Sequence, residues 1–187
     1  MENRFSKDSG EDCTLSVDAA DFIIAEPAPY VREVSKIWYS KKSNGPALRY
    51  ELGVTIKTGD IVWLHGPFPC GQYNDCTIFN NSLSTFLEEN ERVEADDGYR
   101  AADPGKVKSK SGLSSQYSSK EQLDVKNRVR ARHETANKRI KQFSALSGIF
   151  RHNLNAHSDF VYAAVVITQI SIEMGEPLFQ VGYENMA

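Results

Sequence analysis

Residues 50–65 read YELGVTIKTGDIVWLH, and this stretch decides the fold class. Apolar residues alternate with other types over residues 50–56, a pattern typical of a strand with one buried face. Residues 57–59 have turn composition, and residues 61–65 return as a mostly apolar strand. The sequence therefore predicts a β-hairpin, and the remaining elements have to form a sheet around it.

The segments on either side of this hairpin show both strand and helix patterns. Before it, residues 14–24 alternate as a strand that contains Asp18. After it we expect a loop over 66–71, a helix over 76–90, a strand over 92–95 and a turn over 96–99. A linker over 103–119, with one short strand near Val107, should follow. Two helices complete the chain: one over 120–143 that begins with a Ser118–Glu121 capping box, and a buried one over 160–174 that ends at Gly175. This order predicts an α/β (α+β) fold in which helices pack on the faces of a mixed central sheet.

The totals are those of one globular domain. With 187 residues, of which 40% are hydrophobic, the chain can build one packed core, so we expect a flexible leader over residues 1–13 and one domain over residues 14–183. Its 3 cysteines do not form a disulfide framework or a C-x-x-C zinc half-site. An apolar signal core and a membrane-length apolar stretch are both absent, which predicts a soluble intracellular protein.

The charges are segregated along the chain. Residues 1–104 contain 10 Lys and Arg against 18 Asp and Glu, whereas residues 105–152 contain 12 against 3, a balance of +9. Such a basic stretch is suited to a polyanion such as DNA, although basic runs are often only solvated faces.

Three carboxylates occupy positions suited to metal binding. Asp18 lies on the first strand, Asp96 follows the strand over 92–95, and Glu134 lies on the long helix, so one edge of the sheet can bring them together. Phosphodiester cleavage needs an activated nucleophile and a neutralised leaving oxygen, which two Mg²⁺ ions ~3.5–4 Å apart can supply. Mg²⁺ prefers oxygen ligands. Spacing alone does not single out these residues, because any acidic chain of this length offers comparable sets.

Sequence blocks around these residues carry a resemblance. The blocks are SVDAADF (16–22), GPALRYELGVTIKTGDIVWLHGPFPCGQYNDCTIF (45–79), RVEADDGY (92–99) and RHETANKRIKQF (132–143). In this order they resemble the DDE superfamily endonucleases of the Harbinger-like transposase group, over about residues 15–183. The resemblance implies an RNase H-like fold, cleavage and joining of DNA with two Mg²⁺ or Mn²⁺ ions, and Asp18, Asp96 and Glu134 as the metal-binding, catalytic triad.

The chain also departs from the family pattern. Ala19 and Ala20 stand where the family usually has Gly and Thr, and the helix-turn-helix region that such transposases carry upstream lies outside the sequence. A truncated gene model, a domesticated and inactive DNA-binding or interaction protein, and a subunit served by a separate DNA-recognition protein all remain open. A DNA substrate and a eukaryotic family together imply the nucleus.

Other polar residues near the triad have more than one interpretation. Asp75 is expected to be a helix N-cap, with an accessory role near the metals as the alternative. Asp97 is expected to be an accessory neighbour of the ligand Asp96, with the role of ligand itself as the alternative. His133 points about 100° away from Glu134 around the helix and is interpreted as a packing or DNA-contact residue.

The long helix carries the candidate DNA contacts. These are Arg130, Lys138 and Lys141, of which Lys138 lies one turn after Glu134 and is expected either to pair with it or to contact a phosphate.

Overall fold

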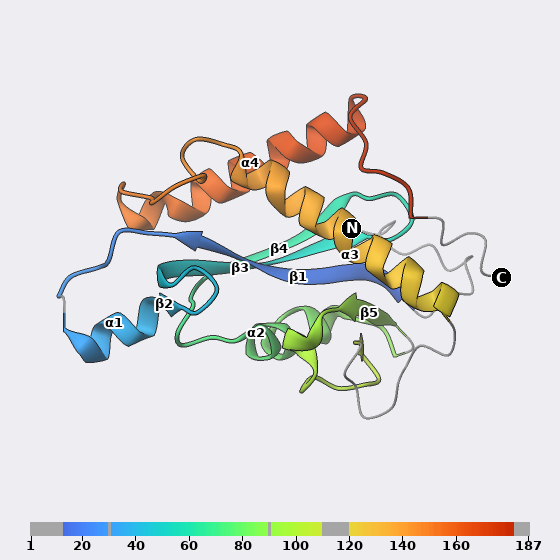
Figure 1. Ribbon diagram of the computed structural model, residues 1–187, viewed down its shortest axis with the longest axis horizontal. Coiled ribbons are helices and arrows are strands. Elements are labelled where there is room, and N and C mark those ends of the chain that lie inside the picture. Colours follow the sequence, from blue (N-terminus) through green and yellow to red (C-terminus); the bar gives the residue numbers. More distant parts are fainter. Residues whose placement is uncertain (1–12, 30, 90, 110–119, 182–187) are drawn as a thin grey trace.

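A six-stranded mixed sheet forms the centre of the computed structural model, which describes residues 13–29, 31–89, 91–109 and 120–181 (Figure 1). The central strand, β1, pairs antiparallel with β3 and parallel with β5. Strand β3 also pairs antiparallel with β2 and β4, and β5 pairs parallel with β6. The strands are β1 (Cys13–Ile23), β2 (Tyr39–Ser40), β3 (Gly45–Thr55), β4 (Ile61–Pro69), β5 (Arg92–Ala95) and β6 (Val107–Lys108).

Helices cover both faces of this sheet. In Figure 1 the long helices α3 and α4 lie on one face, and α2 lies on the other. The helices are α1 (Arg32–Trp38), α2 (Asp75–Asn81), α3 (Lys120–Lys141) and α4 (His157–Glu173), with 3-10 turns η2 (Leu83–Phe86), η3 (Asp97–Tyr99) and η4 (Leu154–Ala156). The predicted fold class, a mixed α+β sheet with helices on its faces, is confirmed.

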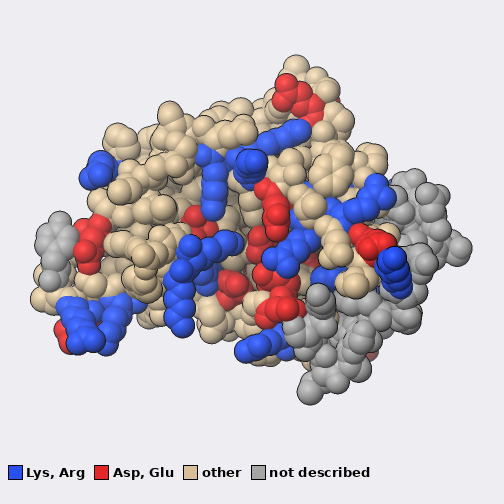
Figure 2. Space-filling view, viewed as in Figure 1, with Lys and Arg blue, Asp and Glu red and all other residues tan. Residues whose placement is uncertain are grey.

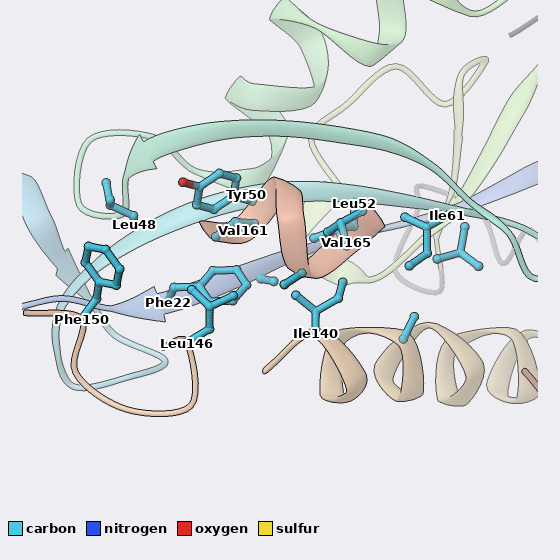
Figure 3. Close-up of a cluster of buried hydrophobic side chains, with 14 of the residues drawn as sticks. Phe22, Leu48, Tyr50, Leu52, Ile61, Ile140, Leu146, Phe150, Val161 and Val165 are labelled. Carbon is cyan, nitrogen blue, oxygen red and sulfur yellow. The ribbon is translucent and has the colours of Figure 1, made fainter. Parts of the chain in front are cut away.

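Three hydrophobic clusters hold these layers, and β1 contributes to the two larger ones on opposite faces because successive side chains of a strand point to opposite faces. Leu15 and Val17 pack in the cluster on the α2 side. Ala20 and Phe22 pack with residues of α3 and α4, as Figure 3 shows for Phe22 and its neighbours. The same alternation places Asp18 on the α3 side of the sheet, in step with Ala20 and Phe22.

The edge of β1 changes its neighbour partway along the strand. Pairing with β5 ends at Val17 and Ala95, whereas pairing with β3 continues to Ile23 and Ala47. From Asp18 onward β1 therefore lies beside the point where β5 leaves the sheet. We call this place the β5 notch, and it positions the candidate site.

Several predicted boundaries are wrong. Residues 66–69 belong to β4 instead of a loop, because the strand pairing shifts register between Arg49 and Glu51 and accommodates an extra residue. The backbone of Gly66 packs against the ring of Tyr50, where a Cβ atom would lie only 2.6 Å from Cδ1 of that ring, so a larger residue does not fit.

The predicted helix over 76–90 is interrupted at Ser82, whose backbone leaves the helical region (φ −135, ψ −94). Its hydroxyl donates to the carbonyl oxygen of Ile78 at 2.5 Å and so replaces a helical amide as that oxygen's donor. A short helix, α1, was not anticipated at all.

Other expectations agree with the structure. The hairpin, the strand β5 and the short strand at Val107 are present, and α3 ends two residues before the expected boundary. Gly175 ends α4 with φ +118. The capping box at Ser118, the leader over residues 1–12 and linker residues 110–119 lie outside the described residues.

Helix α4 was expected to be buried, and this is wrong for one of its faces. Val161 and Ile172 are buried, but Val166, Ile167 and Ile170 are about half exposed. Its apolar composition therefore overstates its burial. Within the part of the chain that the structure describes, no helix has the length and apolar character needed to cross a bilayer.

Candidate metal centre

The β5 notch gathers acidic side chains from separate elements. Asp18 comes from β1, and Asp96 is the residue that follows β5, and the two line the same small cavity of about 20 Å³, room for about one water molecule. Asp75, the first residue of α2, approaches from the opposite face of the sheet. The structure thus brings together two members of the predicted triad and the predicted accessory residue.

Asp18 is a largely desolvated carboxylate. Burial raises its pKa above the ordinary value, Lys42 opposes this rise, and the charge of Asp96 adds to it. Its Oδ2 accepts a hydrogen bond of 3.1 Å from Asn137 Nδ2 on α3. A cation at this place would relieve both the desolvation and the repulsion.

Asp75 and Asp96 meet over Gly98. A Cβ atom built on Gly98 would lie 2.6 Å from Asp75 Oδ2 and 2.8 Å from Asp96 Oδ1, so these two oxygens are at most the sum of those distances apart. Burial raises the pKa of Asp75, and the charges of Asp18 and Asp96 add to the rise while Arg49 opposes it. Two oxygen ligands in adjacent positions on one Mg²⁺, each at ~2.1 Å, lie ~3 Å apart, so a small movement would let both bind one ion.

The predicted N-cap role of Asp75 is wrong. Asn74 caps α2, because its side chain accepts a 2.8 Å hydrogen bond from the amide of Thr77. Asp75 instead forms an ion pair of 2.8 Å with Arg49 Nη1. Its carboxylate is therefore held beside Asp18 and Asp96 by a neighbouring strand.

Glu134 lies further out than the other triad members. Its carboxylate forms an ion pair of 3.4 Å with Arg130, which also lies 3.9 Å from Asp96. The expected pairing of Glu134 with Lys138 is thus replaced by one with Arg130, a turn earlier on α3. Side chains of Arg130 and Glu134 are more than half exposed, and such pairs contribute only ~0–1 kcal/mol. Glu134 can therefore change partner at small cost.

Polar contacts fix the rotation of α3 about its axis. Lys126 forms a buried ion pair of 3.4 Å with Glu94 on β5, and Arg132 donates to the backbone oxygen of Thr55 at 2.7 Å. His133 is buried, and its Nδ1 lies 2.8 Å from Ser16 Oγ. These contacts hold α3 so that Asn137 reaches Asp18. The burial of His133 favours the packing interpretation over DNA contact, and the residue lines the cavity at the notch.

Burial lowers the pKa of His133 to about 4. Its ring is therefore neutral at physiological pH, and Nε2 has no hydrogen-bond partner within the described residues. Asp97, unlike Asp96, is exposed, and its charge opposes the fall that burial causes in the pKa of Lys126, a residue that lines the cavity.

Basic side chains surround the acidic group. Figure 2 shows a band of acidic side chains in the middle of this face with Lys and Arg on both sides. Lys141 reaches toward β1, with its Nζ 5.3 Å from the centre of the Phe22 ring. Lys138 instead lines a separate groove between α3 and α4, with Phe143 and Ile167. Of the candidate DNA contacts, Arg130 and Lys141 border the notch and Lys138 does not.

No set of three or more His, Cys, Asp or Glu side chains within residues 13–29, 31–89, 91–109 and 120–181 is arranged to hold a metal ion as it stands. Asp18, Asp75 and Asp96 offer hard oxygen donors in mutual repulsion, and this donor chemistry fits Mg²⁺ or Mn²⁺. Glu134 would have to leave Arg130 to join them.

The sequence indicated Asp18 and Asp96 as residues of this site. It assigned Asp75 mainly to a helix cap, and it gave no indication of Lys42. The Asp75 signal was its position in a quoted block, whereas Lys42 lies outside the functional patterns and only the fold brings it to Asp18.

The Gly98→Ala substitution is expected to separate the two carboxylates that meet over this residue. Because the atoms in the way are the ends of flexible side chains, metal-free stability should change little. The apparent affinity for Mn²⁺ should fall at least ~10-fold, or ~1.4 kcal/mol less stabilisation at saturating metal. Calorimetric titration with Mn²⁺ and melting curves with and without the ion measure both effects. Gly148→Ala is the matched control, since a Cβ there meets nothing within 4 Å, and equal effects of the two substitutions would contradict the prediction.

Comparisons with known proteins add no family. No protein-family model matches the chain, and no curated protein matches it significantly.

Proposed function

We propose that this chain is a divalent-metal-dependent DNA endonuclease with the cleavage and strand-transfer chemistry of DDE transposases. The observation that carries the proposal is the convergence of Asp18, Asp75 and Asp96, from three different elements, at the β5 notch. The sequence blocks similar to the Harbinger-like group surround the same residues, and Glu134 lies above the notch on α3. Asp18, Asp96 and Glu134 would hold two Mg²⁺ or Mn²⁺ ions, with Asp75 as a further oxygen ligand.

When bound, such ions would activate the attacking oxygen and neutralise the leaving one. The protein's own contribution is positioning. Asn137 holds Asp18 by its 3.1 Å hydrogen bond, and Arg49 holds Asp75 by its 2.8 Å ion pair. Arg130 would release Asp96 and Glu134 to the cations and then be free to contact a phosphate of the DNA.

A specific observation also favours a second function. Arg130 lies between Asp96 and Glu134, and a guanidinium in that place can substitute for a cation in a site that no longer binds one. This arrangement suits a domesticated, catalytically inactive DNA-binding or interaction protein. The intact triad favours the endonuclease, because a protein without catalytic work has no need of three carboxylates here.

The partners follow from the same proposal. The substrate is DNA, and a separate DNA-recognition protein or subunit would supply target choice. The DNA and the recognition protein would both be found in the nucleus, which is therefore the proposed compartment.

The test is cleavage of supercoiled plasmid in Mg²⁺ or Mn²⁺. We expect the wild type to nick the plasmid only with added metal and Asp96→Asn to reduce nicking at least ~100-fold, which corresponds to ~2.7 kcal/mol of lost transition-state stabilisation. Asp97→Asn is the matched control, because it removes the same charge from the neighbouring exposed residue. Gel electrophoresis of the plasmid over time gives the rates.

Three outcomes decide between the functions. Metal-dependent nicking that survives Asp97→Asn and not Asp96→Asn supports the endonuclease. DNA binding without nicking in any metal supports the inactive protein. Equal nicking by wild type and Asp96→Asn identifies a contaminating nuclease and leaves the endonuclease proposal refuted.

A further inference from the structure

A pair of lysines borders the β5 notch on the side away from Arg130. Lys42 lies in the turn between β2 and β3, and its Nζ reaches the carbonyl oxygen of Ala19 at 3.5 Å. Lys141, on α3, places its Nζ over Phe22. The two ammonium groups therefore come from separate elements to the stretch of β1 that follows Asp18.

The two lysines also influence each other and the same carboxylate. Burial and then the charge of Lys42 lower the pKa of Lys141, whereas Asp21 and Asp18 raise it. Lys42 is likewise the first charged group to act on Asp18. The contacts with Ala19 and Phe22, residues of β1 that follow Asp18, are the geometric counterpart of these couplings.

The turn that carries Lys42 is held in place. Ser40 Oγ donates to the buried carboxylate of Asp21 at 2.6 Å and accepts from the amide of Ser43 at 3.1 Å. Tyr39 donates to the side chain of Asn44 at 2.6 Å across the turn. Lys42 is thus an exposed cation on an anchored support, which is the arrangement a binding contact needs.

Asp21 does not need these lysines as counter-charges. Arg49 already binds it through two hydrogen bonds of 2.7 and 2.9 Å. Within the described residues Asp18 has no such arginine hydrogen bond, and Lys42 is the largest charge that acts on it. Cations bound at Asp18 would neutralise it and so remove one counter-charge from the exposed Lys42 and the half-buried Lys141.

We propose that Lys42 and Lys141 bind a phosphate of the DNA backbone beside the cleaved bond. This inference rests on the proposed function, because it assigns a phosphodiester to a place next to the catalytic carboxylates. Lysine ammonium groups bind backbone phosphates as point charges and without regard to sequence. The pair would fix where the strand lies relative to Asp18, and would not select which sequence is cut.

The experiment measures binding and not cleavage. Fluorescence anisotropy of a labelled 20-base-pair duplex is followed in Ca²⁺ at several salt concentrations, with the integrity of the DNA checked on gels. Lys42→Ala should weaken binding about 3- to 10-fold and lower the slope of log affinity against log salt by about 1. Lys42→Arg should restore the slope. Lys41→Ala is the matched control, an exposed lysine one residue earlier in the same turn.

The possible failures are distinguishable. If the wild type binds and nicks DNA but Lys42→Ala keeps its slope, the phosphate site is overturned and the endonuclease stands. If Lys41→Ala lowers the slope as much as Lys42→Ala, the effect is diffuse charge and the site is overturned as well. If Lys42→Ala lowers the slope while the wild type never nicks, the phosphate site stands on an inactive DNA-binding protein. If the wild type does not bind DNA, both proposals fail.

Discussion

Asp18→Asn is expected to change stability in opposite directions with and without metal. In metal-free buffer the variant should melt a few degrees higher, because burial and the charge of Asp96 make the ionised Asp18 unfavourable. In Mg²⁺ or Mn²⁺ at ~100 times the dissociation constant, the wild type should gain ~2.7 kcal/mol, or roughly 5–10 °C, and the variant should gain almost nothing. Nicking should fall at least ~100-fold in the same variant.

Melting curves with EDTA and with each metal measure the reversal. Asp124→Asn is a suitable control, since it removes the same charge from an exposed position of α3 and should leave the metal response unchanged. An unaltered metal response in Asp18→Asn would remove this residue from the metal site. A lower metal-free melting temperature would show that its hydrogen bond from Asn137 outweighs the repulsion.

The sheet was predictable because its signals are local. Alternation over residues 50–56 and 14–24 predicted β3 and β1, and the short apolar run at Arg92–Ala95 predicted β5. The places where prediction failed depend on tertiary contacts. Ser82, where α2 ends, donates to Glu51 Oε2 on β3 at 3.4 Å, and β4 passes the ring of Tyr50 at Gly66. Both contacts join residues that are far apart in the sequence.

The residues of the candidate site likewise fall into those that the sequence indicated and those that only the fold brings together. The sequence blocks around Asp18 and Asp96 drew attention to these two residues, whereas their position on or directly after a strand would not have singled them out. The hydrogen bond from Asn137 to Asp18 joins residues that are far apart in the sequence, so it appears only in the fold. Lys42 lies in the turn between β2 and β3, and its Nζ reaches the carbonyl oxygen of Ala19 only because β3 pairs with β1, so no spacing could have indicated it.

A second acidic residue, buried on β3 and affected by the charge of Asp75, controls how stability depends on pH. Glu51 on β3 is fully buried, and its Oε2 accepts a 3.0 Å hydrogen bond from Trp63 and a longer one from Ser82. Burial raises its pKa from 4.5 to about 7, because these hydrogen bonds only partly offset the lost hydration. The folded protein therefore retains a proton on Glu51 at pH values where the unfolded chain has released it.

The direction of the effect follows from this difference. A folded-state pKa above the unfolded value contributes stability that is complete below pH 4.5 and lost as the pH rises to about 7. At 1.36 kcal/mol per unit the loss is about 3 kcal/mol. His133 and His157, whose pKa values burial lowers to about 4, act in the opposite direction over an overlapping range. The wild-type curve alone therefore cannot isolate Glu51.

The Glu51→Gln substitution isolates the contribution of Glu51 to the pH dependence of stability. The glutamine oxygen can accept from Trp63 and Ser82, and its amide can donate to the hydroxyl of Tyr99, which lies 3.5 Å from Glu51 Oε1. We expect wild type and variant to have similar stability at pH 4.5 and the variant to be more stable by about 3 kcal/mol at pH 8. Urea unfolding of both proteins across this range gives the difference curve, in which the histidine contributions cancel. A flat difference curve would mean that Glu51 is ionised in the fold at neutral pH, with its hydrogen bonds compensating fully for burial.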